Sequence, residues 1–186
     1  HGQGMETTLA QVAAAELGIP LDHVRVIHGD TGNSPYAMGT WGSRGATLGG
    51  GAVALAARDL RDKLLQIAAH NLEIGPHDLE LRDGIAAVKG APARNIPIVT
   101  LARWALQDPI HLPPGMPPGL QQTRFMDGVE RGVFSNGCHA AVVRVDAELG
   151  KVAIVRYVAV EDCGTMINPM IVDGQVQGGV AQGIGS

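Results

Sequence analysis

The sequence predicts an α+β fold, with helices packed on mixed or antiparallel sheets. Two observations carry this prediction. Apolar residues recur at helical spacing in the segments 5–17 and 46–72, and two pairs of short apolar runs are each joined by a turn sequence, as in β-hairpins. The chain has 186 residues, of which 45% are hydrophobic, and this is enough to form a sizeable core.

The first helix is expected to run from Met5 to Leu17, because Gly18 and Pro20 follow as helix-ending residues. The segment 23–28 then alternates polar and β-branched residues, which predicts a half-buried strand. A long Gly/Ser/Thr loop leads from this strand to the second helix, whose charged side chains are typical of a solvated face.

The pair Asp83-Gly84 lies between the runs 79–82 and 85–89 and predicts a hairpin. A short helix is expected over 100–106. The segment 112–119 is rich in proline, which removes backbone donors and excludes a helix or a central strand.

Two further runs, 140–146 and 151–160, are joined at residues 147–150 and predict a well-buried hairpin. Asn168-Pro169 predicts the start of the last helix, because Asn accepts from free N–H groups and Pro fits the first turn.

The proline-rich segment suggests a division into two lobes. Residues 1–111 would form the first lobe, and residues 112–186 the second, which would be incomplete at its C-terminus. The chain begins at His1 rather than Met and stops within the last predicted helix, so we expect a fragment of a longer polypeptide. An exposed pocket wall would favour self-association into an oligomer or contact with the missing part.

Composition argues against several function classes. A net charge of −4, 3% aromatic residues and no basic run argue against nucleic-acid binding. No apolar segment approaches the ~20 residues that span a bilayer, and no signal peptide is recognisable, so a cytoplasmic location is expected. Cys138 and Cys163 lie far apart, and the seven histidines lack metal-site spacing, so no protein-held metal is predicted.

Three glycine-glutamine segments indicate a ligand. Glycine lets backbone N–H groups approach a partner closely, and Gln and Ser supply neutral donors and acceptors. Two of the glycine-rich segments precede helices, whose N-termini suit phosphate. Their spacing is neither that of a nicotinamide motif nor that of a P-loop. The segments are Gly2-Gln3-Gly4, Gly174-Gln175 and Gln182-Gly183-Ile184-Gly185, linked by Gly39-Thr40-Trp41-Gly42-Ser43-Arg44-Gly45.

Small residues in the last helix fit two interpretations. Gly174, Gly178, Ala181 and Gly185 would form one stripe, which serves either close helix packing or a ligand. Periodicity alone leaves both open.

Taken together, the segments resemble the molybdenum-binding large subunit of the xanthine dehydrogenase, aldehyde oxidase and carbon monoxide dehydrogenase family. The most specific block is Asp-x-Gly-x-x-Ile-Asn-Pro, followed by Gly-Gln-Val and Gln-Gly-Ile-Gly. The resemblance covers almost the whole chain and implies a fold of the molybdenum cofactor-binding domain type. The residues that carry it are His1-Gly2-Gln3-Gly4 with Glu6-Thr7, Gly29-Asp30-Thr31, Gly39-Thr40-Trp41-Gly42-Ser43-Arg44, Glu161 to Pro169, Gly174 to Gly179 and Ala181 to Gly185.

The resemblance implies a molybdopterin cofactor with molybdenum, in bacteria usually the cytosine dinucleotide. Gln3 and Gly4 would contact its phosphate or pterin part. The pyrophosphate and nucleotide side would be held by Thr40, Gly42, Ser43 and Arg44. Asp162, Cys163, Asn168 and Gln182 would complete the cradle. Cys163 would be a packing or backbone contact, because the family's molybdenum is held by the cofactor's dithiolene sulfurs.

The implied reaction is hydroxylation with oxygen from water, on an aldehyde, an N-heterocycle or carbon monoxide as small-molecule substrate. Electrons would leave through [2Fe-2S] clusters on a small subunit to FAD on a medium subunit. The first half of the large subunit would be a further partner. The family's catalytic glutamate belongs to a Gly-x-Gly-Glu segment beyond residue 186, so we assign no catalytic residue and expect the chain alone to be inactive. Glu161 is expected to be a strand-end residue and Glu6 a first-turn helix charge.

Two alternatives stay open at this stage. The chain could be a non-catalytic module, either a split subunit that completes a cofactor pocket or a relic whose glycines serve folding. A generic sugar or nucleotide binder would require the family resemblance to be accidental.

Overall fold

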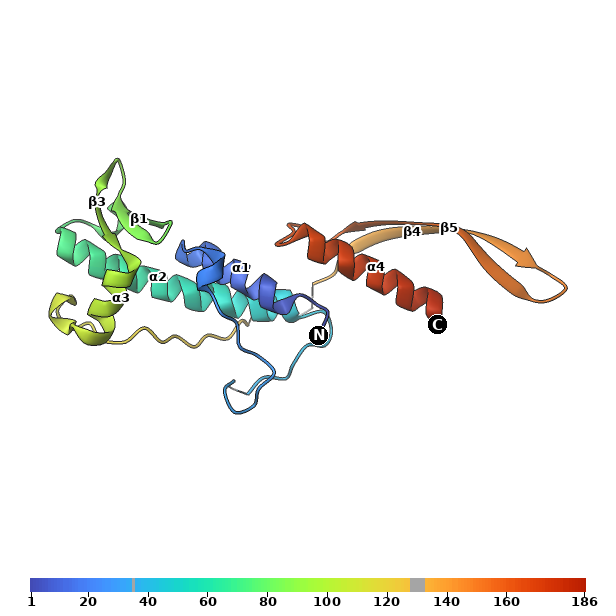
Figure 1. Ribbon diagram of the computed structural model, residues 1–186, viewed down its shortest axis with the longest axis horizontal. Helices are drawn as coiled ribbons and strands as arrows, with labels where there is room; N and C mark the ends of the chain where they lie inside the picture. Colours follow the sequence, from blue (N-terminus) through green and yellow to red (C-terminus); the bar gives the residue numbers. More distant parts are fainter. Residues whose placement is uncertain (35, 128–132) are drawn as a thin grey trace. The chain divides into compact units, whose positions relative to one another are not determined.

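The computed structural model describes residues 1–34, 36–127 and 133–186. It forms two compact units, which we describe separately: Gly4–Glu130, and His1–Gln3 together with Arg131–Ser186. Helices and small antiparallel sheets make up both units, so the predicted α+β class is confirmed (Figure 1). None of the helices in the described part of the chain is long and apolar enough to cross a membrane.

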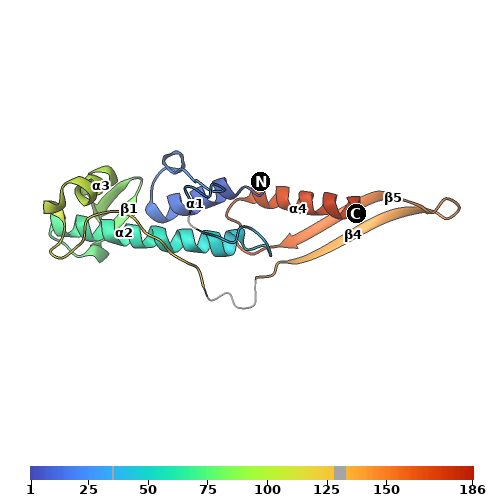
Figure 2. The same ribbon diagram turned by 90° about the horizontal axis from the view of Figure 1, so that it is seen from below.

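Two helices form the long axis of the larger unit. α1 (Met5–Leu17) packs along α2 (Gly51–Leu72), which a π-helical segment, η2 (Gly45–Gly50), precedes (Figure 2). Both predicted helices are therefore confirmed, with α1 at the predicted bounds. The α1 helix ends at Gly18, whose left-handed backbone donates its N–H to the Ala14 carbonyl.

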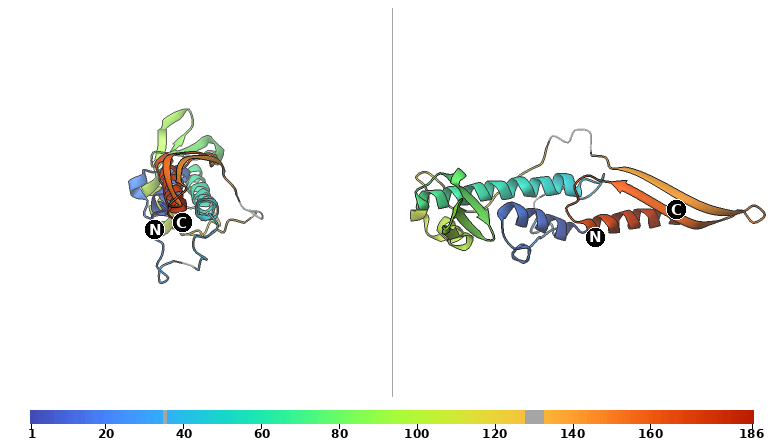
Figure 3. Two further views of the ribbon diagram at one scale, coloured as in Figure 1. Left: turned by 90° about the vertical axis from the view of Figure 1, so that its right-hand side faces the viewer. Right: turned by 90° about the horizontal axis from the view of Figure 1, so that it is seen from above.

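A three-stranded antiparallel sheet lies at the C-terminal end of α2 (Figure 3). It consists of β1 (Leu79–Arg82), β2 (Ile85–Val88) and β3 (Ala91–Pro97), in that order. The predicted hairpin at Asp83-Gly84 is confirmed, with φ values of 50° and 75° that suit its two-residue turn. The sequence analysis missed β3.

Helix α3 (Ile98–Gln107) follows the sheet directly and is three residues longer than predicted. Short 3-10 turns complete this unit: η1 (Leu21–His23), η3 (Pro76–Asp78) and η4 (Pro109–His111). The core lies between α2, α3 and the sheet, and its buried residues are Leu64, Ile67, Ala68, Ala69, Leu79, Ala86, Ile96, Leu101, Ala105 and Leu112.

The proline-rich segment has no helix or strand, as predicted. It packs instead on the core through Met116 and Leu120. Lys63 on α2 donates to the carbonyls of Pro117 and Gly119, both at 2.7 Å, and holds the segment in place. The division into lobes at residues 111 and 112 stays a prediction.

The smaller unit consists of a long hairpin and a helix. β4 (Asn136–Asp146) pairs antiparallel with β5 (Lys151–Asp162), and α4 (Pro169–Gly185) runs beside the hairpin in all views (Figures 1 to 3). The register shifts at Val142/Val143, where β5 carries an extra residue. Both strands and the final helix lie where the sequence predicts them.

Two predictions are wrong. Residues 24–28 form no strand, although Val24 and Val26 are half-buried as alternation requires, because no described segment pairs with them. The hairpin β4–β5 is not well buried: its valines are largely exposed, for example Val145 at 61% and Val160 at 64%. Apolar alternation predicts strands, but burial of their side chains also requires cover from another segment, which alternation does not predict.

Candidate functional site

The start of α1 and the start of η2 lie side by side in the larger unit. A Cβ on Gly45 would lie 2.9 Å from the Met5 sulfur and 3.7 Å from Cγ2 of Thr40. Only glycine fits at this position without moving Met5. The fold thus brings together Gly4 and the 40–44 segment, two of the predicted cofactor segments.

Both segments expose helix N-termini without a side-chain cap. Gly4 is the N-cap of α1 and Arg44 that of η2, and neither N-cap side chain accepts a hydrogen bond from the first-turn N–H groups. The residues in front of them are left-handed, with φ of 67° at Gly4, 59° at Gly42 and 56° at Ser43. First-turn N–H groups with no protein acceptor, together with the helix dipole, favour an anion.

Arg44 is half-buried and oriented by its own loop. Its Nε donates to the Gly39 carbonyl at 2.8 Å, and its guanidinium carbon lies 5.0 Å from the centre of the Trp41 ring. A guanidinium is planar and has five N–H donors, so those on the terminal nitrogens can bind two oxygens of an anion such as phosphate. Trp41 is 59% exposed, and the sequence analysis assigned it no role.

In the smaller unit, two predicted residues shape the backbone between β5 and α4. Asp162 accepts from the N–H of Gly164 at 2.9 Å, and Gly164 has a φ of 76°. Asn168 caps α4, accepting from the N–H of Ile171 at 3.2 Å, as its position before proline predicts. Cys163, between these residues, carries an exposed free thiol.

Helix α4 presents open glycines and three glutamines, of which the family resemblance singles out Gln175 and Gln182. Gln175 donates to the Gly2 carbonyl at 3.4 Å, which ties the chain start to α4. Gln182 is exposed, and its backbone carbonyl accepts from the Ser186 hydroxyl. A Cβ on Gly174 or Gly178 would meet no atom within 4 Å, so neither position is packed against the described protein.

The ten predicted contact residues therefore fall into two groups, one in each unit. The larger unit holds Gly4, Thr40, Gly42, Ser43 and Arg44, and the smaller unit holds Gln3, Asp162, Cys163, Asn168 and Gln182.

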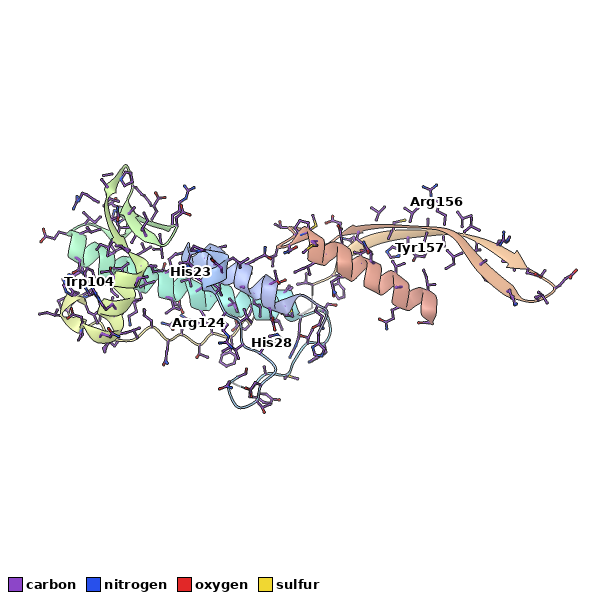
Figure 4. The ribbon with its side chains drawn as sticks, in the orientation of Figure 1. His23, His28, Trp104, Arg124, Arg156 and Tyr157 are labelled. Carbon is purple, nitrogen blue, oxygen red and sulfur yellow. The ribbon has the colours of Figure 1, made fainter. Side chains whose placement is uncertain are left out.

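Acidic groups near these segments already have partners. Glu6, in the first turn of α1 as predicted, lies 3.2 Å from Nε2 of His28, a residue labelled in Figure 4. Asp30 accepts from the Gly32 N–H and from Asn33, which holds the pKa of its carboxyl below the ordinary 3.8. Within the described residues, no cluster of three His, Cys, Asp or Glu side chains could hold a metal ion.

The sequence analysis did not predict a hydrogen-bonded cluster of side chains on the hairpin. His139 contacts both Tyr157 and Glu161, the strand-end residue of β5. The predicted turn at 147–150 could have indicated it, because counting residues back from the turn along both strands places residue 139 near residues 157–161.

A family model described as the molybdopterin cofactor-binding domain matches residues 1–186. The chain belongs to this family. The predicted family and its molybdenum cofactor-binding fold are therefore confirmed.

Among relatives of this molybdopterin-binding domain is the nicotine 6-hydroxylase large subunit of Paenarthrobacter nicotinovorans, which is 46% identical over 185 residues and covers 100% of the chain. The carbon monoxide dehydrogenase large chain of Hydrogenophaga pseudoflava is 40% identical over 98% of the chain. The chain spans 22% of the length of each relative.

Solved structures agree with this assignment. Quinoline 2-oxidoreductase from Pseudomonas putida 86 superposes with a TM-score of 0.90 at 43% identity, over 99% of this chain and 23% of that chain. The Cu,Mo-carbon monoxide dehydrogenase superposes with a TM-score of 0.84 at 40% identity, over 96% of this chain and 22% of that one.

Proposed function

We propose that this chain is the part of a molybdenum hydroxylase large subunit that holds molybdopterin cytosine dinucleotide. The observation that carries the proposal is the pair of uncapped helix starts, at Gly4 and Arg44, that lie side by side. Two converging sets of backbone N–H groups and one guanidinium fit a pyrophosphate, which is the most highly charged part of this cofactor.

In the larger unit, we assign the pyrophosphate to the backbone at Gly4, Gly42 and Ser43 and to the guanidinium of Arg44. The backbone is left-handed at all three positions, a conformation that recurs in loops whose successive N–H groups bind anions. The hydroxyl of Thr40 would contact the nucleotide side.

In the smaller unit, we assign the pterin edges to Gln3, Cys163, Asn168 and Gln182. An amide side chain pairs with the donor-acceptor edge of a heterocycle, and the oxygen of Asn168 caps α4 at the end of the turn that would face the pterin. Asp162 would act through the turn that it closes by its bond to Gly164.

The bound cofactor would supply hydroxylation of an electrophilic carbon with oxygen from water. This chain would orient the cofactor and offer groups of complementary charge. We assign no general base among the acidic residues near the two groups of contact residues. Glu6 pairs with His28, Glu161 with His139, and Asp162 with a backbone N–H. We therefore place the base outside the matched part of the relatives and expect no turnover by this chain alone.

Substrate and partners follow from the relatives. Their names include a nicotine hydroxylase, a quinoline oxidoreductase and carbon monoxide dehydrogenases, which supports an N-heterocycle or carbon monoxide as substrate. An aldehyde is the third substrate class that we propose. Names such as "large subunit" and "large chain" support partner subunits, to which we assign the [2Fe-2S] clusters and FAD, in a cytoplasmic complex.

The test is cofactor content. The complete large subunit, produced with its partners in a host that makes the cytosine dinucleotide, should contain molybdenum and release cytidine nucleotide on acid treatment. Arg44→Gln should lose most of both, whereas Arg103→Gln, which changes an exposed arginine on α3, should keep them. Absence of molybdenum and pterin from the unaltered subunit would instead support a non-catalytic module.

A further inference from the structure

The hairpin β4–β5 carries a cluster of three hydrogen-bonding side chains. His139 Nδ1 lies 2.9 Å from the Tyr157 hydroxyl, and His139 Nε2 lies 2.6 Å from a carboxylate oxygen of Glu161. The His139 and Tyr157 rings meet edge to face, with centroids 5.6 Å apart. This cluster lies at the end of the hairpin from which the chain continues to the turn 162–168.

Strand register puts all three residues on one face. Glu161 lies opposite Gly137, and Tyr157 lies opposite Ala141, so His139 is the diagonal neighbour of both. Figure 4 shows Tyr157 and its neighbour Arg156 on opposite faces of the hairpin, as strand alternation requires. The cluster thus spans both strands.

Gly137 provides the space for this contact. A Cβ at this position would lie 2.6 Å from a carboxylate oxygen of Glu161, closer than real Cβ contacts come. The side chains of His139 and Glu161 are 35% and 26% exposed, so both are partly accessible to water. A glycine at position 137 therefore lets the Glu161 carboxylate lie where it contacts His139.

Chemistry assigns the direction of each bond. An ionised carboxylate only accepts, so His139 Nε2 carries the proton that Glu161 receives. In the neutral imidazole, Nδ1 is then the acceptor, and the Tyr157 hydroxyl donates to it. The charge-assisted bond to Glu161 is the stronger of the two and fixes the carboxylate.

We propose that His139 is a positioning residue for the cofactor turn that begins at Asp162. Glu161 directly precedes Asp162, so the bond across the strands fixes the last paired residues of β5. The bulge at Val142/Val143 already shifts the pairing once, and a further one-residue slip would turn Asp162 to the other face of the hairpin. The inference rests on the proposed function, because it takes Asp162 and Cys163 to adjoin the cofactor.

The experiment uses the complete large subunit with its partner subunits, from a host that makes the cofactor and from one that does not. Two variants are compared, His139→Leu and His139→Gln, with His77→Leu as control, because His77 is 84% exposed on η3. The readouts are the rate at which molybdenum is lost on dialysis and the Tm of the loaded and empty forms.

His139→Leu should lose molybdenum about tenfold faster, which is the size expected for one hydrogen bond to a charged group. It should also narrow the difference in Tm between the loaded and empty forms, because that difference measures cofactor binding to the folded state. His139→Gln should restore most of both effects, since an amide N–H can replace the bond to Glu161.

A His139→Leu variant that lowers both Tm values equally and loses molybdenum at the rate of the His77→Leu control would overturn the inference. Such a result would show a structural role alone and would leave the proposed function intact. An unaltered subunit without molybdenum would overturn the proposed function itself, so the two failures are distinguishable.

Discussion

The guanidinium of Arg44 lies over the ring of Trp41, 5.0 Å from its centre, in the loop that precedes η2. The Trp41 ring restricts the guanidinium on one face, and the hydrogen bond from Nε to the Gly39 carbonyl fixes its orientation. The guanidinium of this candidate phosphate site is thus oriented before any ligand binds.

Replacing Trp41 should weaken cofactor retention without removing a direct contact. Trp41→Leu frees Arg44, and an exposed cation–π contact contributes about 0.5–1 kcal/mol, so the complete subunit should lose its nucleotide roughly threefold faster. Trp41→Phe keeps a ring and should stay near the unaltered rate. Equal rates for the Leu and Phe variants would show that the ring does not orient Arg44. Cytidine nucleotide in the dialysate is the measurement.

Asn168 caps α4 through its side-chain oxygen, and two substitutions test this role. Asn168→Ala removes the cap on Ile171 and should destabilise the start of α4 by about 1 kcal/mol, seen as roughly fivefold faster amide exchange at Ile171 and Val172. Asn168→Asp keeps the acceptor oxygen and should restore slow exchange. Unchanged exchange in the Ala variant would contradict the capping role.

Local chemistry made several elements predictable. Asp83-Gly84 forms its hairpin because both residues tolerate positive φ. Asn168-Pro169 starts α4 because the Asn oxygen accepts from a free N–H group and Pro has no N–H to leave unpaired in the first turn. By contrast, β3 was missed because Ala91–Pro97 contains two prolines and no regular alternation, and it forms only because β2 offers an edge.

The candidate site was predictable in its residues but not in its geometry. The motif segments could be named from glycine, amide and helix-start chemistry and from the family resemblance. The contact between Met5 and Gly45 depends on how α1 packs on η2, so no local sequence pattern predicts it. The same holds for the bond between His139 and Glu161, which requires the register of two long strands.

Acid should weaken the pairing of α1 with α2. The Glu16 carboxylate accepts from Arg58 Nη2 at 2.6 Å and from Arg61 Nη1 at 3.2 Å, and chiefly the bond to Arg58 holds the pKa of Glu16 below its ordinary 4.5. A depressed folded-state pKa stabilises the protein above the ordinary value, and that contribution is lost as pH falls through the folded value.

Glu16→Gln should therefore lower the Tm at neutral pH and flatten the fall in Tm below about pH 5. Glu80→Gln, at an exposed position on β1, should reproduce the unaltered curve. Parallel Tm–pH curves for Glu16→Gln and the unaltered protein would contradict this assignment.

Gly18 and Gly90 allow backbone strain to be separated from steric contact. Both are left-handed, with φ of 61° and 78°, so alanine at either position should cost about 1 kcal/mol from conformation alone. At Gly90 a Cβ would meet no atom within 4 Å, whereas at Gly18 it would overlap the backbone of Leu81 on β1. Gly18→Ala should therefore lower the free energy of unfolding clearly more than Gly90→Ala, because α1 must move away from the β1–β2 hairpin. This movement would also stretch the hydrogen bond that the Gly84 N–H donates to the Gly18 carbonyl at 2.7 Å. Urea unfolding of both variants measures the difference, and equal losses would show that α1 and the hairpin do not pack as described.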